Sequence, residues 1–211
     1  MSVAALITAG GRGTRIRELG TEKPLAPLLG RPMVDLVLEQ LRMVREIDSL
    51  YVSVSDNVPR TREHLLGLGV AVLDTSGAEY CQDLIQAAEG IAEQHMLICP
   101  ADLPLLRAGL AGEIVREYLR RGEPSLTVGV PLEKALELEV DVTFYERAEG
   151  RPIIPCGVSV VERERMLTRE FLPGGYFITE TLDVVLNVNT VRDLRKAEQV
   201  LRERLTGASG S

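Results

Sequence analysis

Short apolar segments and amphipathic helical segments alternate over most of the sequence, and this alternation restricts the possible folds more than any other feature. The apolar runs that predict buried strands are 3–8, 50–54, 70–73, 96–99 and 126–130. Helical spacing, as in Met33, Val37 and Leu41, predicts helices between these runs. Strands that alternate with helices form a mostly parallel sheet with helices on its faces. The sequence therefore predicts an α/β chain built as a three-layer α/β/α sandwich.

The pattern is less regular beyond residue 131. Apolar runs at 140–145, 158–161 and 184–188 predict three more strands; antiparallel pairing is possible for the first two, so a mixed sheet is expected. Thr190 and Asp193 resemble a capping box ahead of a C-terminal helix. No repeat or linker divides the chain. The sequence predicts a single domain over residues 1–206 and a flexible tail over residues 207–211.

The overall charge restricts the partners of the chain. Its net charge is −7, which disfavours broad electrostatic contact with the phosphates of DNA or RNA. No apolar stretch approaches the roughly 18 residues of a membrane span, and the amino terminus lacks a secretory pattern, so we expect a cytoplasmic protein. Cys81, Cys99 and Cys156 are widely spaced, which argues against a disulfide framework and a cysteine zinc site. The oligomeric state is left open.

A glycine-rich loop follows the first predicted strand. Gly10, Gly11 and Gly13 lie where open α/β sheets bind ligands, at the carboxyl end of a strand. Glycines leave backbone N–H groups uncovered, so that several can point at one anion, and Thr14 adds a hydroxyl donor. The loop therefore predicts a phosphate site.

Two common phosphate-binding loops do not fit this sequence. The nucleoside-triphosphatase loop needs a Gly-Lys pair, and the sequence has none. The dinucleotide fingerprint would place its third glycine at Ile16. Arg12, Arg15 and Lys23 have the charge and reach to bind the outer phosphates of a triphosphate. A polyphosphate ligand is expected, the alternative being a tight turn with incidental surface cations.

Three motifs resemble the signature of a nucleotidyltransferase family that includes sugar-1-phosphate nucleotidyltransferases and the molybdenum-cofactor guanylyltransferase. They are A-G-G-R-G-T-R at residues 9–15, E-K-P-L at 22–25 and G-R-P-M at 30–33. The resemblance implies the Rossmann-like nucleotidyltransferase fold. It also implies transfer of a nucleoside monophosphate from a nucleoside triphosphate to a phosphate group, with release of pyrophosphate.

Further segments are similar to the archaeal adenosylcobinamide-phosphate guanylyltransferases. They are D-T-S-G at 74–77, D-L at 83–84 and N-V-N-T-V-R-D-L at 187–194, whereas residues 132–150 match no motif. This likeness implies GTP and adenosylcobinamide phosphate as substrates. The alternative acceptors are a sugar 1-phosphate and the molybdopterin phosphate.

A magnesium ion is expected at the same sheet edge, because negative charge develops on the leaving pyrophosphate. Asp102 follows the strand-like run 96–99 directly, where the resemblance places the metal aspartate of the family. The second ligand of the family falls on Asn187 or Asn189, and we favour Asn189. The alternative for all three residues is an ordinary turn or helix cap.

The resemblance also assigns roles around the nucleotide. Lys23 would stabilise the transferring phosphoryl group, Arg15 would hold the β and γ phosphates, and Gly157 would let the acceptor approach the backbone. The expected catalytic residues are Lys23, Arg15 and Asp102, and the expected nucleotide-binding residues are Leu6, Ala9, Gly10, Gly11, Arg12, Gly13, Thr14, Arg15, Lys23, Asp74, Thr75, Ser76 and Gly77. A helix cap or turn would equally account for Asp74, and a bulge would also account for Gly157.

Two other classes compete with this prediction. Glycosyltransferases of related topology usually need a D-x-D pair, which Asp102-Leu103-Pro104 does not supply. A non-catalytic nucleotide sensor would keep the glycine loop but would not need Lys23 and a metal carboxylate.

Overall fold

The computed structural model describes residues 1–208 apart from 141, 143 and 149. The side chains of Arg15, Arg17, Glu18 and Ala208 also lie outside the described part. None of the helices in the described part is long and apolar enough to cross a membrane.

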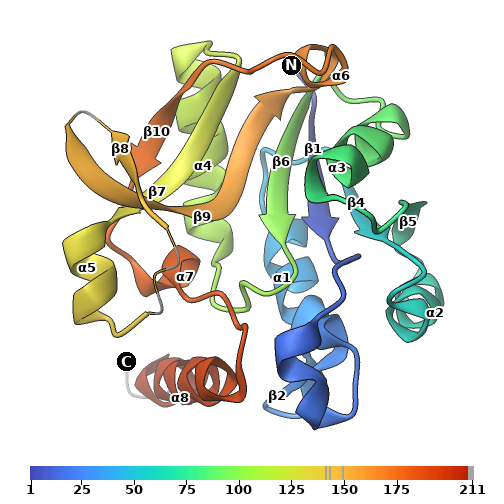
Figure 1. Ribbon diagram of the computed structural model, residues 1–211, viewed down its shortest axis with the longest axis vertical. Helices are drawn as coiled ribbons and strands as arrows, with labels where there is room; N and C mark the ends of the chain where they lie inside the picture. The colour runs from blue at the N-terminus through green and yellow to red at the C-terminus, as the bar shows by residue number, and fades with distance from the viewer. Residues whose placement is uncertain (141, 143, 149, 209–211) are drawn as a thin grey trace.

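One eight-stranded mixed sheet forms the centre of the molecule (Figure 1). Its order is β10-β7-β9-β6-β1-β4-β5, with β8 paired to β9. The strands are β1 (Val3–Thr8), β4 (Ser49–Val54), β5 (Ala71–Asp74), β6 (His95–Pro100), β7 (Ser125–Pro131), β8 (Glu146–Ala148), β9 (Arg151–Glu162) and β10 (Gly174–Ile178). Strand β9 is antiparallel to both β6 and β7, whereas β1, β4, β5 and β6 are parallel neighbours. The predicted mixed, mostly parallel sheet is confirmed.

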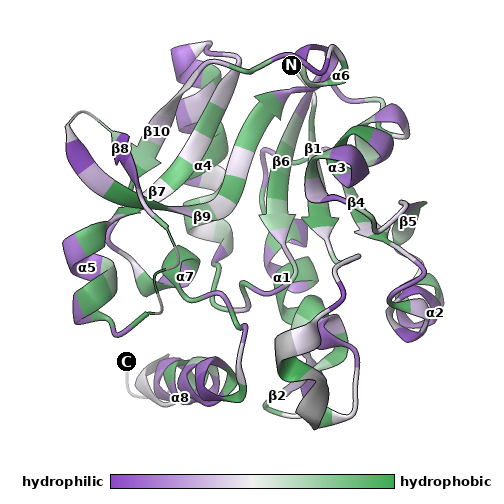
Figure 2. Ribbon diagram, in the orientation of Figure 1, coloured by the Kyte–Doolittle hydropathy of each residue, from purple (hydrophilic) through white to green (hydrophobic). Residues whose placement is uncertain are grey.

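Helices cover both faces of this sheet. They are α1 (Met33–Arg42), α2 (Pro59–Gly67), α3 (Tyr80–Glu89), α4 (Ala108–Arg121), α5 (Leu132–Glu137), α6 (Arg163–Leu167), α7 (Leu182–Val185) and α8 (Val191–Ala208). Two short 3-10 helices, η1 (Thr14–Leu19) and η2 (Lys23–Leu25), and a small ribbon of β2 (Pro27–Leu28) and β3 (Arg31–Pro32) join β1 to α1. Hydrophobic residues gather in the central strands, whereas α8 is largely hydrophilic (Figure 2).

The residues of β1 explain why it is central. Val3, Ala5 and Ile7 pack into one buried cluster with α1 and α4, whereas Ala4 and Leu6 pack on the other side with α3. Because successive side chains of a strand point to opposite faces, a strand that is apolar throughout must be covered on both. The three-layer arrangement predicted from the sequence is thus confirmed.

A third cluster joins the two ends of the chain. Ile16 of η1, Leu28 of β2 and Met33 of α1 are buried together with Leu194 and Ala197 of α8. Thr190 and Asp193 form the predicted capping box, in which each backbone N–H donates to the other side chain (2.8 and 3.2 Å). Helix α8 continues to Ala208, so Gly207 is helical rather than part of a tail, and residues 209–211 lie outside the described residues.

Two strand predictions in the C-terminal part are wrong. The run 184–188 contains no strand, because Thr181 accepts a hydrogen bond from Asp183 N (3.3 Å) and begins the short helix α7. Its apolar side chains are buried without strand pairing. The edge strand is instead β10, which the sequence analysis did not predict. The run 140–145 is irregular where it is described, with 141 and 143 outside the described residues, and β8 begins only at Glu146.

The buried carboxylate of Asp183 ties the C-terminal elements together. It accepts hydrogen bonds from Arg107 Nε (2.5 Å) and from Arg204 of α8, and Arg204 also donates to the Leu105 carbonyl (2.9 Å). Asp183 is 1% exposed, so these two arginines take the place of water around its carboxylate. The network connects α7 and α8 to the segment that follows Asp102.

Asp183→Asn should lower the free energy of unfolding by about 1–3 kcal/mol, because the arginines lose their anionic partner while remaining partly exposed to water. Urea denaturation followed by circular dichroism measures this change. Glu198→Gln is the control, since Glu198 forms only an i,i+4 surface pair with Arg202 and should cost less than about 0.5 kcal/mol. Equal denaturation midpoints for Asp183→Asn and wild type would contradict the prediction.

Candidate active site

The register of the central strands brings the functional loops together. Thr8 at the end of β1 is paired with Ser53 of β4 on one side and with Pro100 of β6 on the other. Because these strands are parallel, the residues that follow them leave the sheet side by side. The glycine loop, the segment after β4 and the segment with Asp102 therefore meet at one edge.

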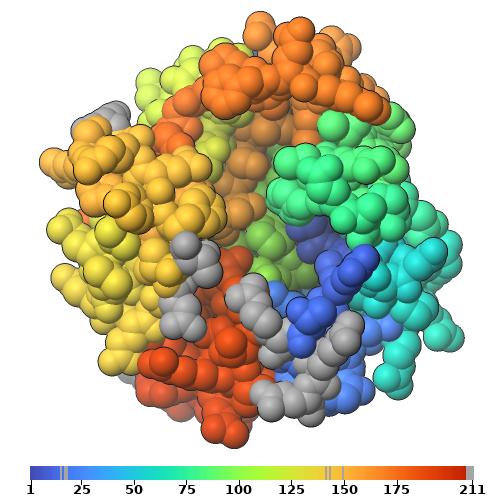
Figure 3. All heavy atoms as spheres, in the orientation of Figure 1, coloured from blue at the N-terminus to red at the C-terminus, as the bar shows by residue number. Residues whose placement is uncertain are grey.

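A cavity of about 420 Å³ lies at this edge. Residues 8–14, 77–80 and 100–102 contribute to its walls, together with Lys23 and Asn189. The space-filling view shows the molecule hollowed between its N-terminal segments and its C-terminal segments (Figure 3). The cavity is large enough for much of a nucleotide, in the range of small-molecule sites.

Gly13 allows the glycine loop and Lys23 to approach each other. Its φ of +53° lies in the left-handed region, and a Cβ atom there would come within 2.8 Å of Lys23 Cβ. Any larger residue would therefore strain the backbone and displace the lysine. The glycine is needed to bring Lys23 beside the loop.

Ser55 and Asn57 fasten the loop to its neighbours. Ser55 Oγ donates to the Gly10 carbonyl (2.7 Å), and Asn57 Nδ2 donates to Gly10 O (3.3 Å) and Gly77 O (3.4 Å). Gly77 has a φ of +67°, and a Cβ there would lie 2.5 Å from Asn57 Nδ2. Neither residue was predicted from the sequence, although Ser55 directly follows β4 at the same edge of the sheet, and this position is a usable signal.

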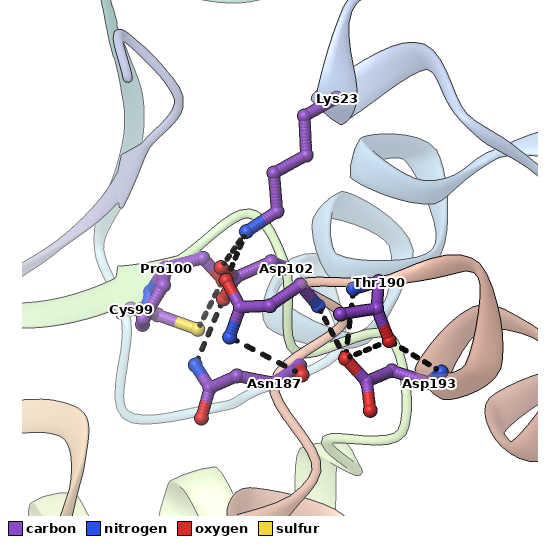
Figure 4. A network of polar contacts seen from close by, with 8 residues as sticks. Lys23, Cys99, Pro100, Asp102, Asn187, Thr190 and Asp193 are labelled. Carbon is purple, nitrogen blue, oxygen red and sulfur yellow. Dashed lines mark hydrogen bonds and ion pairs between the residues drawn. The ribbon is translucent and has the colours of Figure 1, made fainter. Parts of the chain in front are cut away.

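Lys23, Asp102, Asn187 and Asn189 form one polar network (Figure 4). Lys23 Nζ lies 2.5 Å from Asp102 Oδ2 and 2.8 Å from Asn189 Oδ1. Asn187 Nδ2 donates to the other carboxylate oxygen of Asp102 (2.9 Å). The Lys23 and Asp102 side chains are only 17% and 18% exposed, so their attraction is weakly screened by water. Residues that are far apart in the sequence thus converge as predicted.

The same atoms fit a divalent cation. Asp102 Oδ2 and Asn189 Oδ1 both point at one positively charged group, the Lys23 ammonium. They are the hard oxygen donors that Mg²⁺ prefers, and Mg²⁺ commonly uses few protein ligands beside substrate phosphates. Asn187 differs, because it turns its amide nitrogen rather than its oxygen toward Asp102. Among the described residues, Asp102 and Asn189 are therefore better candidates for metal ligands than Asn187.

Most of the expected nucleotide-binding residues line the cavity. They are Ala9, Gly10, Gly11, Arg12, Gly13, Thr14, Lys23, Thr75 and Gly77. The side chain of Arg15 lies outside the described part of the chain, so its contact with the β and γ phosphates stays a prediction.

Three of the expected contacts differ in the structure. Leu6 is fully buried in mid-strand and paired with Tyr51 and Ile98, which leaves its main chain engaged within the sheet. Asp74 faces Arg62 (2.9 Å), whose guanidinium lowers the pKa of that carboxyl, rather than the cavity.

Ser76 is the third, since its hydroxyl donates to Asp83 Oδ1 (2.8 Å) and its contribution is to shape the loop. The same oxygen of Asp83 accepts from Gly77 N (2.9 Å). Leu6, Asp74 and Ser76 are thus not among the residues that line the cavity, and their contact with a nucleotide stays a prediction.

Tyr80 is a cavity residue that the sequence analysis did not identify. Tyr80 is 54% exposed as a residue, but desolvation of its phenol at the cavity is the main reason why its pKa is raised to about 12, and the Asp102 carboxylate adds to this effect. A hydrogen bond with Thr8 acts in the opposite direction. The phenol consequently stays neutral at physiological pH and can donate a hydrogen bond.

Gly157 supports the cavity wall from behind. It has a φ of +77° and lies where the pairing of β9 with β7 shifts, between Thr127 and Gly129. A Cβ at this position would lie 3.0 Å from Pro100 Cγ, and Pro100 lines the cavity. The bulge that was the alternative explanation for Gly157 is therefore present next to the site, and a contact with the acceptor stays a prediction.

Comparison with known proteins agrees with this geometry. Adenosylcobinamide-phosphate guanylyltransferase of Methanocaldococcus jannaschii is 29% identical, over 94% of this chain and 97% of the relative. The 2-C-methyl-D-erythritol 4-phosphate cytidylyltransferase of Frankia casuarinae is 29% identical, over 84% of this chain and 65% of the relative.

Solved structures show the same fold. A CMP:2-keto-3-deoxy-manno-octonic acid synthetase complexed with CTP superposes with a TM-score of 0.75 at 14% identity, covering 97% of this chain and 100% of that one. The family model of the MobA-like NTP transferase domain matches residues 5–147, from β1 into β8. Because this match spans most of the chain, the protein belongs to the MobA-like NTP transferase family and is a nucleotidyltransferase.

Proposed function

We propose that the protein transfers GMP from GTP to adenosylcobinamide phosphate, yielding adenosylcobinamide-GDP and pyrophosphate. The observation that carries this proposal is the identity with the archaeal guanylyltransferase along nearly the whole length of both chains. The cavity supports it, because the glycine loop, Lys23 and Asp102 meet where a nucleotide would have to react.

The glycine loop is proposed to bind the triphosphate. The main-chain N–H groups of Gly10, Gly11 and Gly13 suit an anion, and Arg12 lines the same wall. Lys23 would approach the α-phosphate, and Arg15 would hold the departing β and γ phosphates.

The reaction needs no covalent intermediate. A phosphate oxygen of the acceptor, ionised near neutral pH, attacks the α-phosphorus of GTP, and the bond from that phosphorus to the bridging oxygen of the β-phosphate breaks. Pyrophosphate leaves with the electron pair of that bond. Positioning and charge neutralisation then account for most of the rate, and we infer no general base.

Asp102 and Asn189 are the residues that would hold Mg²⁺. When bound, the ion would neutralise charge on the leaving pyrophosphate. Asn187 would keep the Asp102 carboxylate oriented through its hydrogen bond to Oδ1.

Guanine is proposed to bind where Thr75, Gly77, Glu79 and Asp83 line the cavity. Guanine presents two adjacent donors, N1–H and the exocyclic amine, whereas the corresponding edge of adenine presents one donor and one acceptor. A carboxylate at this end therefore favours guanine. The acceptor would enter on the side of Pro100, where Gly157 packs behind the cavity wall without a side chain.

A product assay tests the proposal. The protein is incubated with GTP and Mg²⁺, separately with adenosylcobinamide phosphate, molybdopterin and a sugar 1-phosphate, and pyrophosphate and the GDP-linked product are measured. We expect both products with adenosylcobinamide phosphate. Efficient reaction with another acceptor and none with this one would refute the choice of acceptor, and nucleotide binding without pyrophosphate would favour the sensor.

A further inference from the structure

The carboxylate of Glu22 bonds to a helix that is distant in the sequence. Glu22 immediately precedes Lys23, and its Oε1 accepts from Arg60 N (2.9 Å). Its Oε2 accepts from both Thr61 N (2.6 Å) and Thr61 Oγ1 (2.5 Å). These donors belong to the first turn of α2, so one carboxylate satisfies three hydrogen-bond donors there.

Helix α2 lacks a cap from its own sequence. Val58 stands at the N-cap position and supplies no side-chain hydrogen bond, and Pro59 has no N–H group. Glu22 therefore takes the place of the missing cap and places negative charge at the positive end of the helix. Thr61 is fully buried, which fixes the position of the contact within the protein.

Lys23 is held on two sides as a result. The residue before it, Glu22, is hydrogen-bonded to α2, and the Cβ of Lys23 lies against Gly13 of the glycine loop. The side chain of a lysine has four rotatable bonds, so the place of its ammonium depends on where its Cα is held. Glu22 sets that place, and the ammonium reaches Asp102 and Asn189.

We infer that Glu22 is a positioning residue, which anchors the Lys23 turn to α2 and so aims the lysine at the reacting phosphate. The inference rests on the proposed role of Lys23 in nucleotidyl transfer. Glu22 itself has no role in the chemistry.

The position of Glu22 indicates that it affects turnover rather than nucleotide affinity. A second cavity, of about 290 Å³, adjoins the first and is lined by Arg12, Glu22, Lys23 and Arg60 among others. A helix N-terminus attracts phosphate unless it is occupied, and Glu22 occupies that of α2. Removing the carboxylate therefore misplaces Lys23 but frees donors that favour anions, so turnover should fall without a loss of nucleotide affinity.

Two variants test this inference by steady-state kinetics. Glu22→Ala should lower kcat by about tenfold to a hundredfold, as expected for a displaced reacting group, with KM for GTP within about twofold of wild type. Glu22→Gln should keep more of the wild-type kcat than Glu22→Ala does. Its amide oxygen can accept hydrogen bonds in place of one carboxylate oxygen, whereas its amide nitrogen cannot accept a hydrogen bond from the remaining donor.

The reactivity of Lys23 supplies a second measurement, independent of turnover. Sulfo-N-hydroxysuccinimide acetate acylates amines, and the sequence has only two other lysines, Lys134 and Lys196, as internal references. In wild type the ammonium is engaged by Asp102 and Asn189. Glu22→Ala should speed acylation of Lys23 several-fold relative to the references, as read by mass spectrometry.

Two controls separate positioning from stability. Leu65→Val weakens the buried face of α2 and should lower the denaturation midpoint while keeping kcat. Glu63→Ala removes an exposed carboxylate from the same helix and should change neither.

Wild-type kcat and an unchanged Lys23 acylation rate in Glu22→Ala would overturn the inference, as would an equal loss of kcat in Leu65→Val. If wild type turns over no acceptor, the proposed function fails, and the acylation rate still decides whether Glu22 positions Lys23.

Discussion

Lys23→Ala should lower kcat for nucleotidyl transfer by roughly a hundredfold to a thousandfold, the usual loss when one charged or hydrogen-bonding group is removed from a transition state. The ammonium is largely buried at the cavity where the glycine loop would present the triphosphate, so it would meet the charge that develops on the transferring phosphoryl group. Pyrophosphate release under saturating substrates measures the effect. Lys23→Arg should recover little, because a planar guanidinium cannot replace a compact ammonium in that space.

Lys134→Ala is the matched control for this experiment. Lys134 lies on α5 and forms only a local pair with Glu137 (2.9 Å). Its removal should leave kcat at the wild-type value. Circular dichroism spectra of both variants should match that of wild type, and a near-wild-type rate for folded Lys23→Ala would remove the lysine from the mechanism.

Asp102→Asn should have an effect of similar size, roughly a hundredfold to a thousandfold in kcat, with a higher Mg²⁺ concentration at half-maximal rate. The amide keeps the shape of the carboxylate but removes the charge that Lys23 contacts and that a divalent cation would require. Titration of the rate against Mg²⁺ at fixed GTP measures both changes. An unchanged Mg²⁺ dependence would show that Asp102 is not a metal ligand.

Asp48→Asn provides the comparison for Asp102. Asp48 accepts a hydrogen bond from Val3 N (2.8 Å), at the end of β1 opposite to the glycine loop. The same chemical change at this position should leave both kcat and the Mg²⁺ dependence unaltered.

The sequence predicted those parts of the fold and site that depend on local pattern. Apolar runs identified β1, β4, β6 and β7, because a buried strand needs apolar residues on both faces, and they also identified the edge strand β5. The convergence of Lys23, Asp102 and Asn189 was predictable for a related reason. Parallel strands end at a common edge, and Asp102 directly follows the end of β6 at that edge, whereas the family resemblance indicated Lys23 and Asn189.

Features that depend on distant partners could not be predicted in this way. The run 184–188 is as apolar as a strand, but its side chains are buried against distant parts of the chain in two hydrophobic clusters, and it pairs with no strand in the described part of the structure. Asp74 stands in a motif-like segment, yet its carboxylate is engaged by Arg62. The role of Glu22 could not be predicted for the same reason, because its hydrogen-bond partners are almost forty residues away in the sequence.

The cluster that joins η1, β2 and α1 to α8 has a consequence for biosynthesis. Ile16 and Met33 are made well before their buried partners Leu194 and Ala197. Asn187 and Asn189, which complete the surroundings of Asp102, also belong to this late segment. A nascent chain that stops after β7 contains the glycine loop, Lys23 and Asp102. It lacks Asn187 and Asn189, so the surroundings of Lys23 and Asp102 are incomplete. The enzyme therefore becomes competent only after α8 has been made, so chains that terminate before α8 should be inactive.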